Sequence, residues 1–100
     1  MTVMDLECDG PVVEWRGPAP FYFLRIPEDE SADIKVAAQG IEYWGQVPVV
    51  ARINGHEFTT ALFPKDGVYL LPLKVAVRDR AGIDPDTDEV LSVALSVGRR

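Results

Sequence analysis

The 100-residue sequence predicts an α+β domain that is mainly β: a small antiparallel-rich barrel of about six to seven strands with two short helices. Short apolar runs alternate with hairpin turn signals, of which Asn54-Gly55 is the strongest. Helical patterns occupy only residues 28–40 and 73–81, and residues 89–97 show the apolar alternation of a strand with one buried face. No repeat or linker-like segment divides residues 1–100, so we expect a single barrel domain.

The first quarter of the chain predicts two strands. A turn-prone Asp-Gly-Pro at residues 9–11 predicts that the first strand is interrupted or bulged. FYFLRIP, residues 21–27, is apolar on both faces apart from Arg25. We expect the barrel interior to cover one face of this second strand, and a helix or a partner to cover the other. An acidic first turn opens the helix predicted over residues 28–40.

The clearest local prediction is the hairpin VPVVARINGHEFTTALF, residues 47–63. A two-residue Asn-Gly turn pairs Ile53 with His56 and Arg52 with Glu57. Arg52 and Glu57 then share the outer face as an exposed ion pair, worth about 0.2 to 1 kcal/mol. Side-chain alternation predicts the residues of this hairpin that face the core: Val47, Val49, Ala51, Ile53, Phe58, Thr60 and Leu62.

A second hairpin, a helix and a closing strand complete the pattern. Pro-Lys-Asp-Gly supplies the second turn, with Gly67 in a left-handed conformation, and residues 68–72 form the return strand. The helix over residues 73–81 ends at a left-handed Gly82. After a loop, the last strand directs four residues inward: Leu91, Val93, Leu95 and Val97.

Composition limits the possible functions. A formal net charge of −6 argues against nucleic acid as a partner, because non-specific affinity for nucleic acid comes mainly from neutralised phosphates. The sequence has no signal-peptide pattern and no apolar run of membrane-spanning length, so we expect a cytoplasmic protein without membrane contact. Cys8 is the only cysteine, which excludes an intramolecular disulfide and a cysteine-based metal cluster.

Several of these segments resemble a known family. FYFLRIP with the acidic helix start, YWGQVPVVARINGHEFTTALFPKDGVYLLPLKVAVRDRAGI and the closing DEVLSVALSV are similar to a bacterial and archaeal family of domains of unknown function. Its members occur alone or fused to bacteriocin-protection domains of the YdeI and OmpD-associated type. The resemblance covers about residues 15–97. It implies a double-split β-barrel, the architecture shared with AbrB-like and MazE-like DNA-binding proteins.

Individual residues match this family's pattern without transferring an activity, because the family's role is unassigned and a shared fold does not imply a shared function. Thr87 departs from the pattern, since the family usually has glycine before Asp88, which puts a positive φ at that corner in doubt. The matching positions are Pro27, Gly45, Val47, Gly55, Thr60, Leu62, Lys74, Arg78, Gly82 and Asp88.

The second helix carries the best candidate site. Lys74 and Arg78 are four residues apart, so they lie on one helical face and could hold a carboxylate or a phosphate. Alternatively, they favour the helix dipole and cover apolar surface with their stems. Trp44, with Tyr43 and Trp15, could line a pocket for a planar ligand or could belong to the core. We expect a ligand to meet Trp44, the strand of Thr60, and the helix of Lys74 and Arg78 together.

Catalytic and metal-binding patterns are missing. Asp84, Asp86 and Asp88 have the spacing that opens an EF-hand loop, but Glu89 and Leu95 stand where that loop needs glycine and a bidentate acid. We therefore predict no metal and no cofactor. His56 is the only histidine, next to a tight exposed turn, so no nucleophile and base are predicted together, and we expect no enzyme activity.

The sequence thus predicts a binding or interaction domain whose partner is a small anionic ligand or another protein. A DNA-binding regulator of the AbrB-like architecture is the first alternative, and an enzyme is the second. The oligomeric state stays open between monomer and homodimer, because the outward face with Phe21 and Phe23 suits either a dimer contact or an intramolecular helix.

Overall fold

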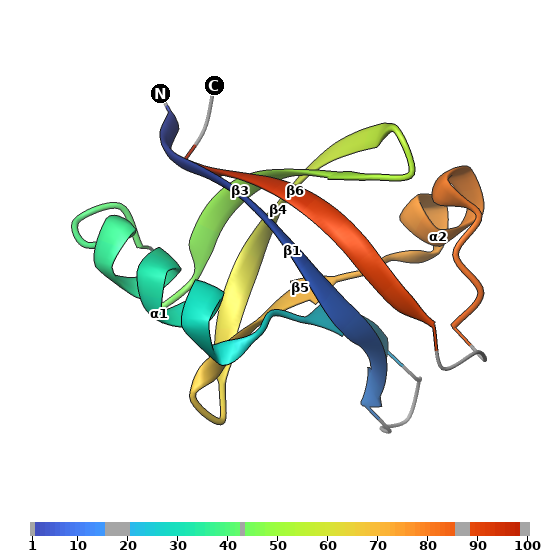
Figure 1. Ribbon diagram of the computed structural model, residues 1–100, viewed down its shortest axis with the longest axis horizontal. Helices are drawn as coiled ribbons and strands as arrows, with labels where there is room; N and C mark the ends of the chain where they lie inside the picture. The colour runs from blue at the N-terminus through green and yellow to red at the C-terminus, as the bar shows by residue number, and fades with distance from the viewer. Residues whose placement is uncertain (1, 16–20, 43, 86–88, 99–100) are drawn as a thin grey trace.

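The computed structural model describes residues 2–15, 21–42, 44–85 and 89–98, with the side chains of residues 2 and 3 excepted (Figure 1). In these ranges the chain forms strands and helices in the order expected, which confirms the predicted fold class of a small β-barrel with two short helices. The elements are β1 (Thr2–Trp15), β2 (Phe21–Arg25), α1 (Glu28–Ala37), β3 (Val47–Ile53), β4 (His56–Lys65), β5 (Val68–Pro72), α2 (Val75–Ala81) and β6 (Val90–Gly98).

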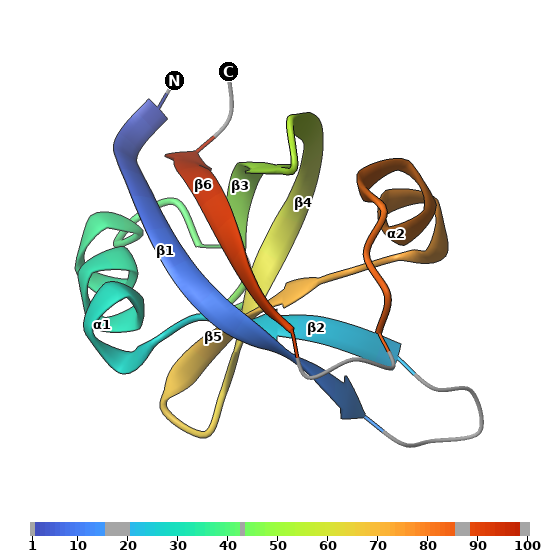
Figure 2. The same cartoon turned by 45° about the vertical axis from the view of Figure 1, so that its right-hand side comes forward.

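The strands close into an antiparallel barrel in the order β1-β2-β5-β4-β3-β6 (Figures 1 and 2). β1 closes it by pairing with β6 as far as Pro11 and with β2 from Val12 onward. The turn-prone residues 9–11 therefore do not interrupt the strand, and the register with β6 shifts instead between Thr2 and Met4. Gly10 permits the change of partner, because a Cβ atom there would overlap with the carbonyl oxygen of Arg25.

Both predicted hairpins form, and the second has a two-residue Asp66-Gly67 turn because β4 continues through Lys65. Ile53 pairs with His56, and the pairing continues without a shift to Val47 and Leu62, so the predicted register is confirmed. Asn54 and Gly55 have φ values of 51° and 80°, and Asp66 and Gly67 have φ values of 52° and 83°. Positive φ at both central positions gives the turn a twist that matches the flanking strands. The expected ion pair joins Arg52 and Glu57 at 3.8 Å on the exposed surface.

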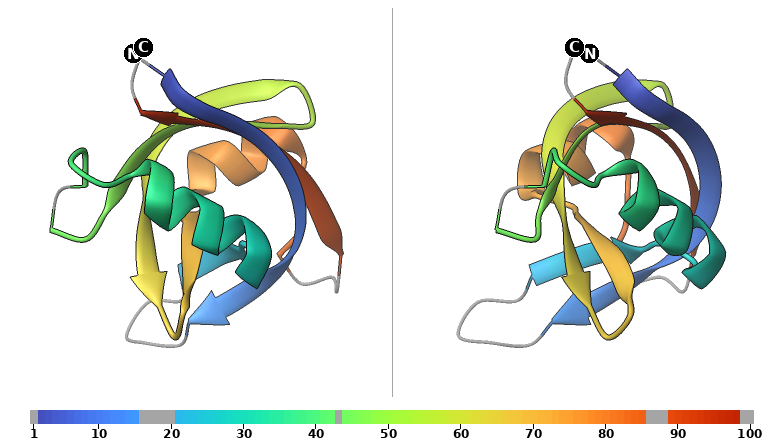
Figure 3. Two further views of the ribbon diagram at one scale, coloured as in Figure 1. Left: turned by 60° about the vertical axis from the view of Figure 1, so that its left-hand side comes forward. Right: turned by 90° about the vertical axis from the view of Figure 1, so that its left-hand side faces the viewer.

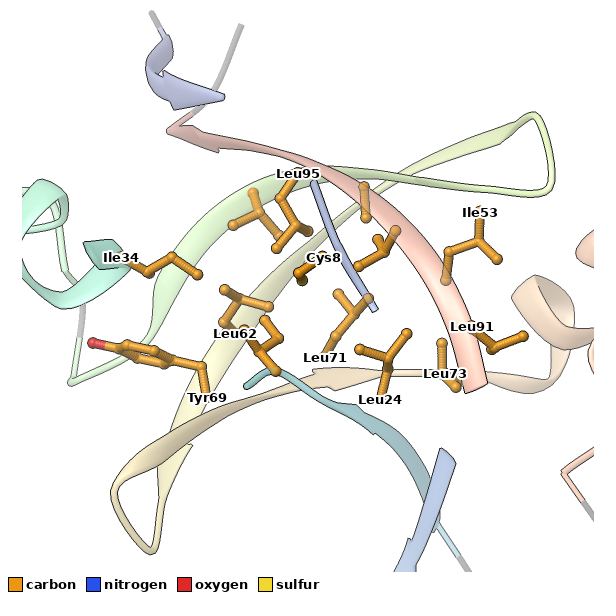
Figure 4. Close-up of a cluster of buried hydrophobic side chains, with 14 of the residues drawn as sticks. Cys8, Leu24, Ile34, Ile53, Leu62, Tyr69, Leu71, Leu73, Leu91 and Leu95 are labelled. Atoms are coloured by element: carbon orange, nitrogen blue, oxygen red, sulfur yellow. The ribbon is translucent and has the colours of Figure 1, made fainter. Parts of the chain in front are cut away.

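Apolar side chains fill the barrel and continue under both helices (Figure 4). Leu24, Leu62, Leu71 and Leu95 come from four strands and are each at most 1% exposed. The four predicted inward residues of β6 are buried as well. α1 covers one opening of the barrel with Ile34, and α2 lies on the far side of the barrel from α1 (Figure 3).

Ser31 ties α1 to the barrel. Its buried hydroxyl donates to the carbonyl of Ile26 at 3.1 Å and accepts the backbone N–H of Tyr69 at 3.0 Å. These two bonds connect α1 to the end of β2 and to β5. A polar side chain can be buried here because both its donor and its acceptor capacities are used.

The outer face of β2 is covered differently from the expectation. Leu24 and Ile26 point into the core, whereas Phe23 points outward and is 7% exposed. Neither helix covers it. Its ring contacts Trp15 of β1, with centroids 6.3 Å apart, and Phe63 of β4, with centroids 5.0 Å apart. Aromatic side chains of β1 and β4 therefore take the place of the predicted covering helix.

Candidate functional site

The predicted site helix is shorter than expected and starts later. α2 begins at Val75, so that Leu73 belongs to the core and Lys74 is the exposed N-cap residue. The predicted end is confirmed, since Gly82 has φ 67° and ψ 36°, and the N–H of Ile83 donates to the carbonyl of Arg78 at 2.9 Å. Arg78 and Arg80 lie in the last turn, where positive charge complements the helix dipole.

Arg78 makes one contact with β2 and one with the segment that precedes α2. Its Nη1 donates to the carbonyl of Leu73 at 2.7 Å, and its guanidinium lies 4.7 Å from the ring centre of Tyr22. The N–H of Leu73 in turn donates to the carbonyl of Tyr22 at 2.9 Å. Both contacts use the charge and the planar face of the guanidinium. They support the structural alternative for this residue.

The structure does not bring the four predicted site residues together. Trp44 is 86% exposed and lies in the loop that follows α1, on the opposite side of the barrel from α2 (Figures 1 and 2). Thr60 is a half-buried residue of β4 and pairs with Val49. The placement of the two segments therefore does not support a single ligand that touches Trp44, Lys74 and Arg78. Tyr43, Asp86, Thr87 and Asp88 lie outside the described residues.

A different surface combines aromatic and cationic side chains. A groove of about 560 Å³ lies on the outer face of β1, β2, β5 and the turn after β4. Phe23, Val68 and Leu70 form its floor and are each at most 7% exposed. We call it the Trp15 groove; the remaining residues that line it are Val13, Glu14, Trp15, Arg25, Lys65 and Asp66.

Strand register places these groups on one face. Val13 pairs with Phe23, Arg25 pairs with Leu70, and Lys65 pairs with Val68. Leu24 and Leu71 alternate with them and point into the core. Side chains two positions apart on a strand share a face, so the floor and the cations of the groove all point outward.

Lys65 and Trp15 meet at the rim of the groove. The Nζ atom of Lys65 lies 4.1 Å above the ring centre of Trp15, whose side chain is 48% exposed. At an exposed site such a cation–π contact is worth about 0.5 to 1 kcal/mol. Arg25 is half-buried across the groove, and within the described part of the chain neither Arg25 nor Lys65 forms an ion pair with a carboxylate. The groove therefore offers two cations and one flat ring above an apolar floor.

Sequence reasoning named Trp15 but missed Arg25 and Lys65 as its companions. One signal was present, since Arg25 is the single charge in FYFLRIP and alternates with the buried Leu24. No local pattern connects Lys65 to Trp15, because the ends of β4 and β1 meet only after the barrel closes.

Cys8 is not suited to nucleophilic chemistry. Burial raises the pKa of its thiol to about 11, and the nearby carboxylates of Glu30 and Asp9 add to the shift. The thiol therefore stays protonated at neutral pH. His56, at the tip of the first hairpin, is exposed. Among the described residues no group of three histidine, cysteine or acidic side chains is arranged to hold a metal ion.

The outer face of β1 is acidic. Asp5, Glu7 and Asp9 are exposed and point away from the core. Asp9 accepts a hydrogen bond from Ser92 at 2.6 Å, and Asp5 accepts one from Ser96 at 2.7 Å. A row of carboxylates repels phosphate backbones.

No helix in the described residues is both long and apolar enough to cross a membrane.

The closed barrel with a helix at one opening and an aromatic and cationic groove on its wall defines a small β-barrel domain. Residues 9–93 match the family described as domain of unknown function DUF1905, and the chain belongs to this family. A comparison with curated proteins finds no match.

Proposed function

We propose that this domain is a non-enzymatic binding module and that the Trp15 groove is its ligand site. The observation that carries the proposal is the pair of cations, Arg25 and Lys65, beside the exposed ring of Trp15. A volume of about 560 Å³ lies within the range of about 300 to 1,000 Å³ that is typical of small-molecule sites. These features support a small anionic ligand.

The α2 surface is the alternative location for an anion. Lys74 and Arg80 are exposed there, which supports a weak anion contact, but the guanidinium of Arg78 is already bonded to the carbonyl of Leu73. An anion at this place would compete with that bond. In the Trp15 groove the ammonium of Lys65 contacts the Trp15 ring, and among the described residues neither Lys65 nor Arg25 forms an ion pair with a carboxylate.

A protein partner or a second copy of the chain is a further alternative. Phe21 is 59% exposed and pairs with Trp15 at the start of β2, which supports an apolar contact beside the groove. The resemblance to domains that occur fused to bacteriocin-protection domains also suits an accessory module. DNA binding of the AbrB-like type is opposed by the net charge of −6 and by the acidic face of β1.

An amide-resolved NMR screen tests the proposal. The domain is titrated with a fragment library that contains anionic, neutral and cationic members, and with short duplex DNA at low salt. We expect anionic fragments to shift the amides of Trp15, Phe23, Arg25 and Leu70. Shifts confined to Lys74 and Arg78 would move the site to α2, and shifts with DNA alone would replace the proposal by the regulator. Light scattering on the same samples measures whether the chain is a monomer or a homodimer.

A further inference from the structure

We propose that the ligand of the Trp15 groove is a planar ring carrying one acid group. The ring stacks on the indole of Trp15, and the acid group is held between Arg25 and Lys65. This inference rests on the proposed function and names the chemical class that the groove selects.

The contact between Lys65 and Trp15 indicates that the ligand contains a planar ring. In the structure its ammonium covers the indole face of Trp15 at 4.1 Å, on a flexible stem at the end of β4. An ammonium on an exposed aromatic face is held weakly and can swing away. The vacated face of Trp15 is flat and about half exposed, and a planar ring fits it better than an aliphatic chain does.

The position of Arg25 indicates an acid group. Its strand neighbour across the pair is the buried Leu70, so the backbone of Arg25 belongs to the paired wall of the barrel. Arg25 presents a planar fork that matches a carboxylate with two parallel hydrogen bonds. Once the ligand ring has displaced it from Trp15, the Lys65 ammonium places a second positive charge in the same groove.

The acidic residues of the groove limit the charge of the ligand. Glu14 and Asp66 line the same hollow as Arg25 and Lys65, so the formal charges of the lining residues cancel. A ligand with a single negative charge gains from the two cations, whereas a polyphosphate would also face two carboxylates. We therefore infer a ring carboxylate or another monoanion, and not a nucleoside triphosphate.

Three probes separate the ring from the charge. 2-Naphthoate has both, 2-naphthamide has the ring alone, and cyclohexanecarboxylate has the acid group alone. Binding is measured by amide shifts of Trp15, Phe23 and Arg25 and by indole emission in a Trp44→Phe background, which leaves Trp15 as the single indole. Trp44 is 86% exposed and is not among the residues that line the groove, so its replacement leaves the lining residues in place.

We expect 2-naphthoate to bind about tenfold more tightly than either single-feature probe, since one charge-assisted contact corresponds to about that ratio. Lys65→Gln and Arg25→Gln should each lower the affinity for 2-naphthoate toward that of 2-naphthamide. Arg25→Gln should leave the affinity for 2-naphthamide unchanged, and Lys65→Gln should not lower it, because the ammonium that covers the Trp15 ring is removed. Lys35→Gln, an exposed cation of α1, is the matched control and should change neither. Melting temperatures of all variants exclude a loss through unfolding.

The outcomes separate this inference from the proposed function. Equal binding of 2-naphthoate and 2-naphthamide in the groove would contradict the requirement for an acid group, but the groove would remain a ligand site. Equal binding of 2-naphthoate and cyclohexanecarboxylate would contradict the requirement for a planar ring. If no probe shifts a groove amide, the ring-acid class is wrong, and the fragment screen decides independently whether the groove binds any ligand.

Discussion

The guanidinium of Arg78 lies 4.7 Å from the ring centre of Tyr22 and donates to the carbonyl of Leu73 at 2.7 Å. One side chain of α2 therefore contacts β2 and the residue that connects β5 to α2. The same arginine was a candidate anion ligand by its spacing from Lys74. Its contacts link the short helix to the barrel, and this link has measurable consequences for stability.

Replacing Arg78 by glutamine should lower the free energy of unfolding by about 1.5 to 3 kcal/mol, because a charge-assisted hydrogen bond and a cation–π contact are lost together. Urea denaturation followed by circular dichroism measures the change. Arg80→Gln is the control, since Arg80 is exposed on the same turn, and it should stay within about 0.5 kcal/mol of the parent. Equal stability of the two variants would contradict the structural role of Arg78.

Local patterns were sufficient for the hairpin of residues 47–63, because the Asn-Gly turn determines the pairing and a one-residue slip would expose Val49 and Ile53. The cation–π contact of Arg78 depends on Tyr22, which is far away in the sequence, so the spacing of Arg78 from Lys74 left two interpretations open. Whether Trp44 and α2 meet one ligand could not be determined from the sequence for the same reason: their relative position depends on barrel closure.

The Trp15 groove was less predictable than the core. Alternation along β2 already separates Phe23 and Arg25 from the inward Leu24. The meeting of Lys65 with Trp15 requires the pairing of β2 with β5 and of β5 with β4, which no local signal encodes. Side chains along a strand alternate between the interior and the exterior of a barrel, so the buried residues can be predicted from a two-residue period in the sequence. A groove on the outer wall depends instead on strand order and twist.

Ser31→Ala should destabilise the domain by about 1 to 3 kcal/mol, because the buried N–H of Tyr69 loses its acceptor. Thermal unfolding measures the effect, and the shift should be largest among the serine variants of this chain. Ser92→Ala is the matched control, since its hydroxyl donates to Asp9 on the exposed surface and its loss should cost less than about 0.5 kcal/mol. If the Ser31→Ala and Ser92→Ala proteins have the same melting temperature, the hydrogen bonds of Ser31 do not stabilise the contact between α1 and the barrel.

Gly10→Ala tests the point where β1 changes partner. The added methyl group would overlap with the carbonyl oxygen of Arg25 and approach Leu24 Cδ2 at 2.8 Å, so the two strands must separate. Overpacking of this kind costs about 1 to 3 kcal/mol or more, and we expect a lower urea midpoint. Glu7→Ala, on an exposed position of the same strand, should leave the midpoint nearly unchanged. An unaltered urea midpoint for Gly10→Ala would mean that β1 and β2 are not in close contact at Gly10 and Arg25.

The pKa of Cys8 predicts how stability depends on pH in alkaline solution. Burial raises it from 9.0 to about 11, so between these values the folded protein binds the thiol proton that the unfolded chain has lost. The contribution of Cys8 to stability is therefore complete below about pH 9 and is lost as the pH rises toward 11. Burial and Glu42 also raise the pKa of Tyr69, which acts in the same direction above pH 10. Urea unfolding from pH 8 to 11 should show a decline that is reduced in Cys8→Ala and in Tyr69→Phe, each compared with its own value at pH 8. A decline of the same size in Cys8→Ala would assign the alkaline loss to other groups.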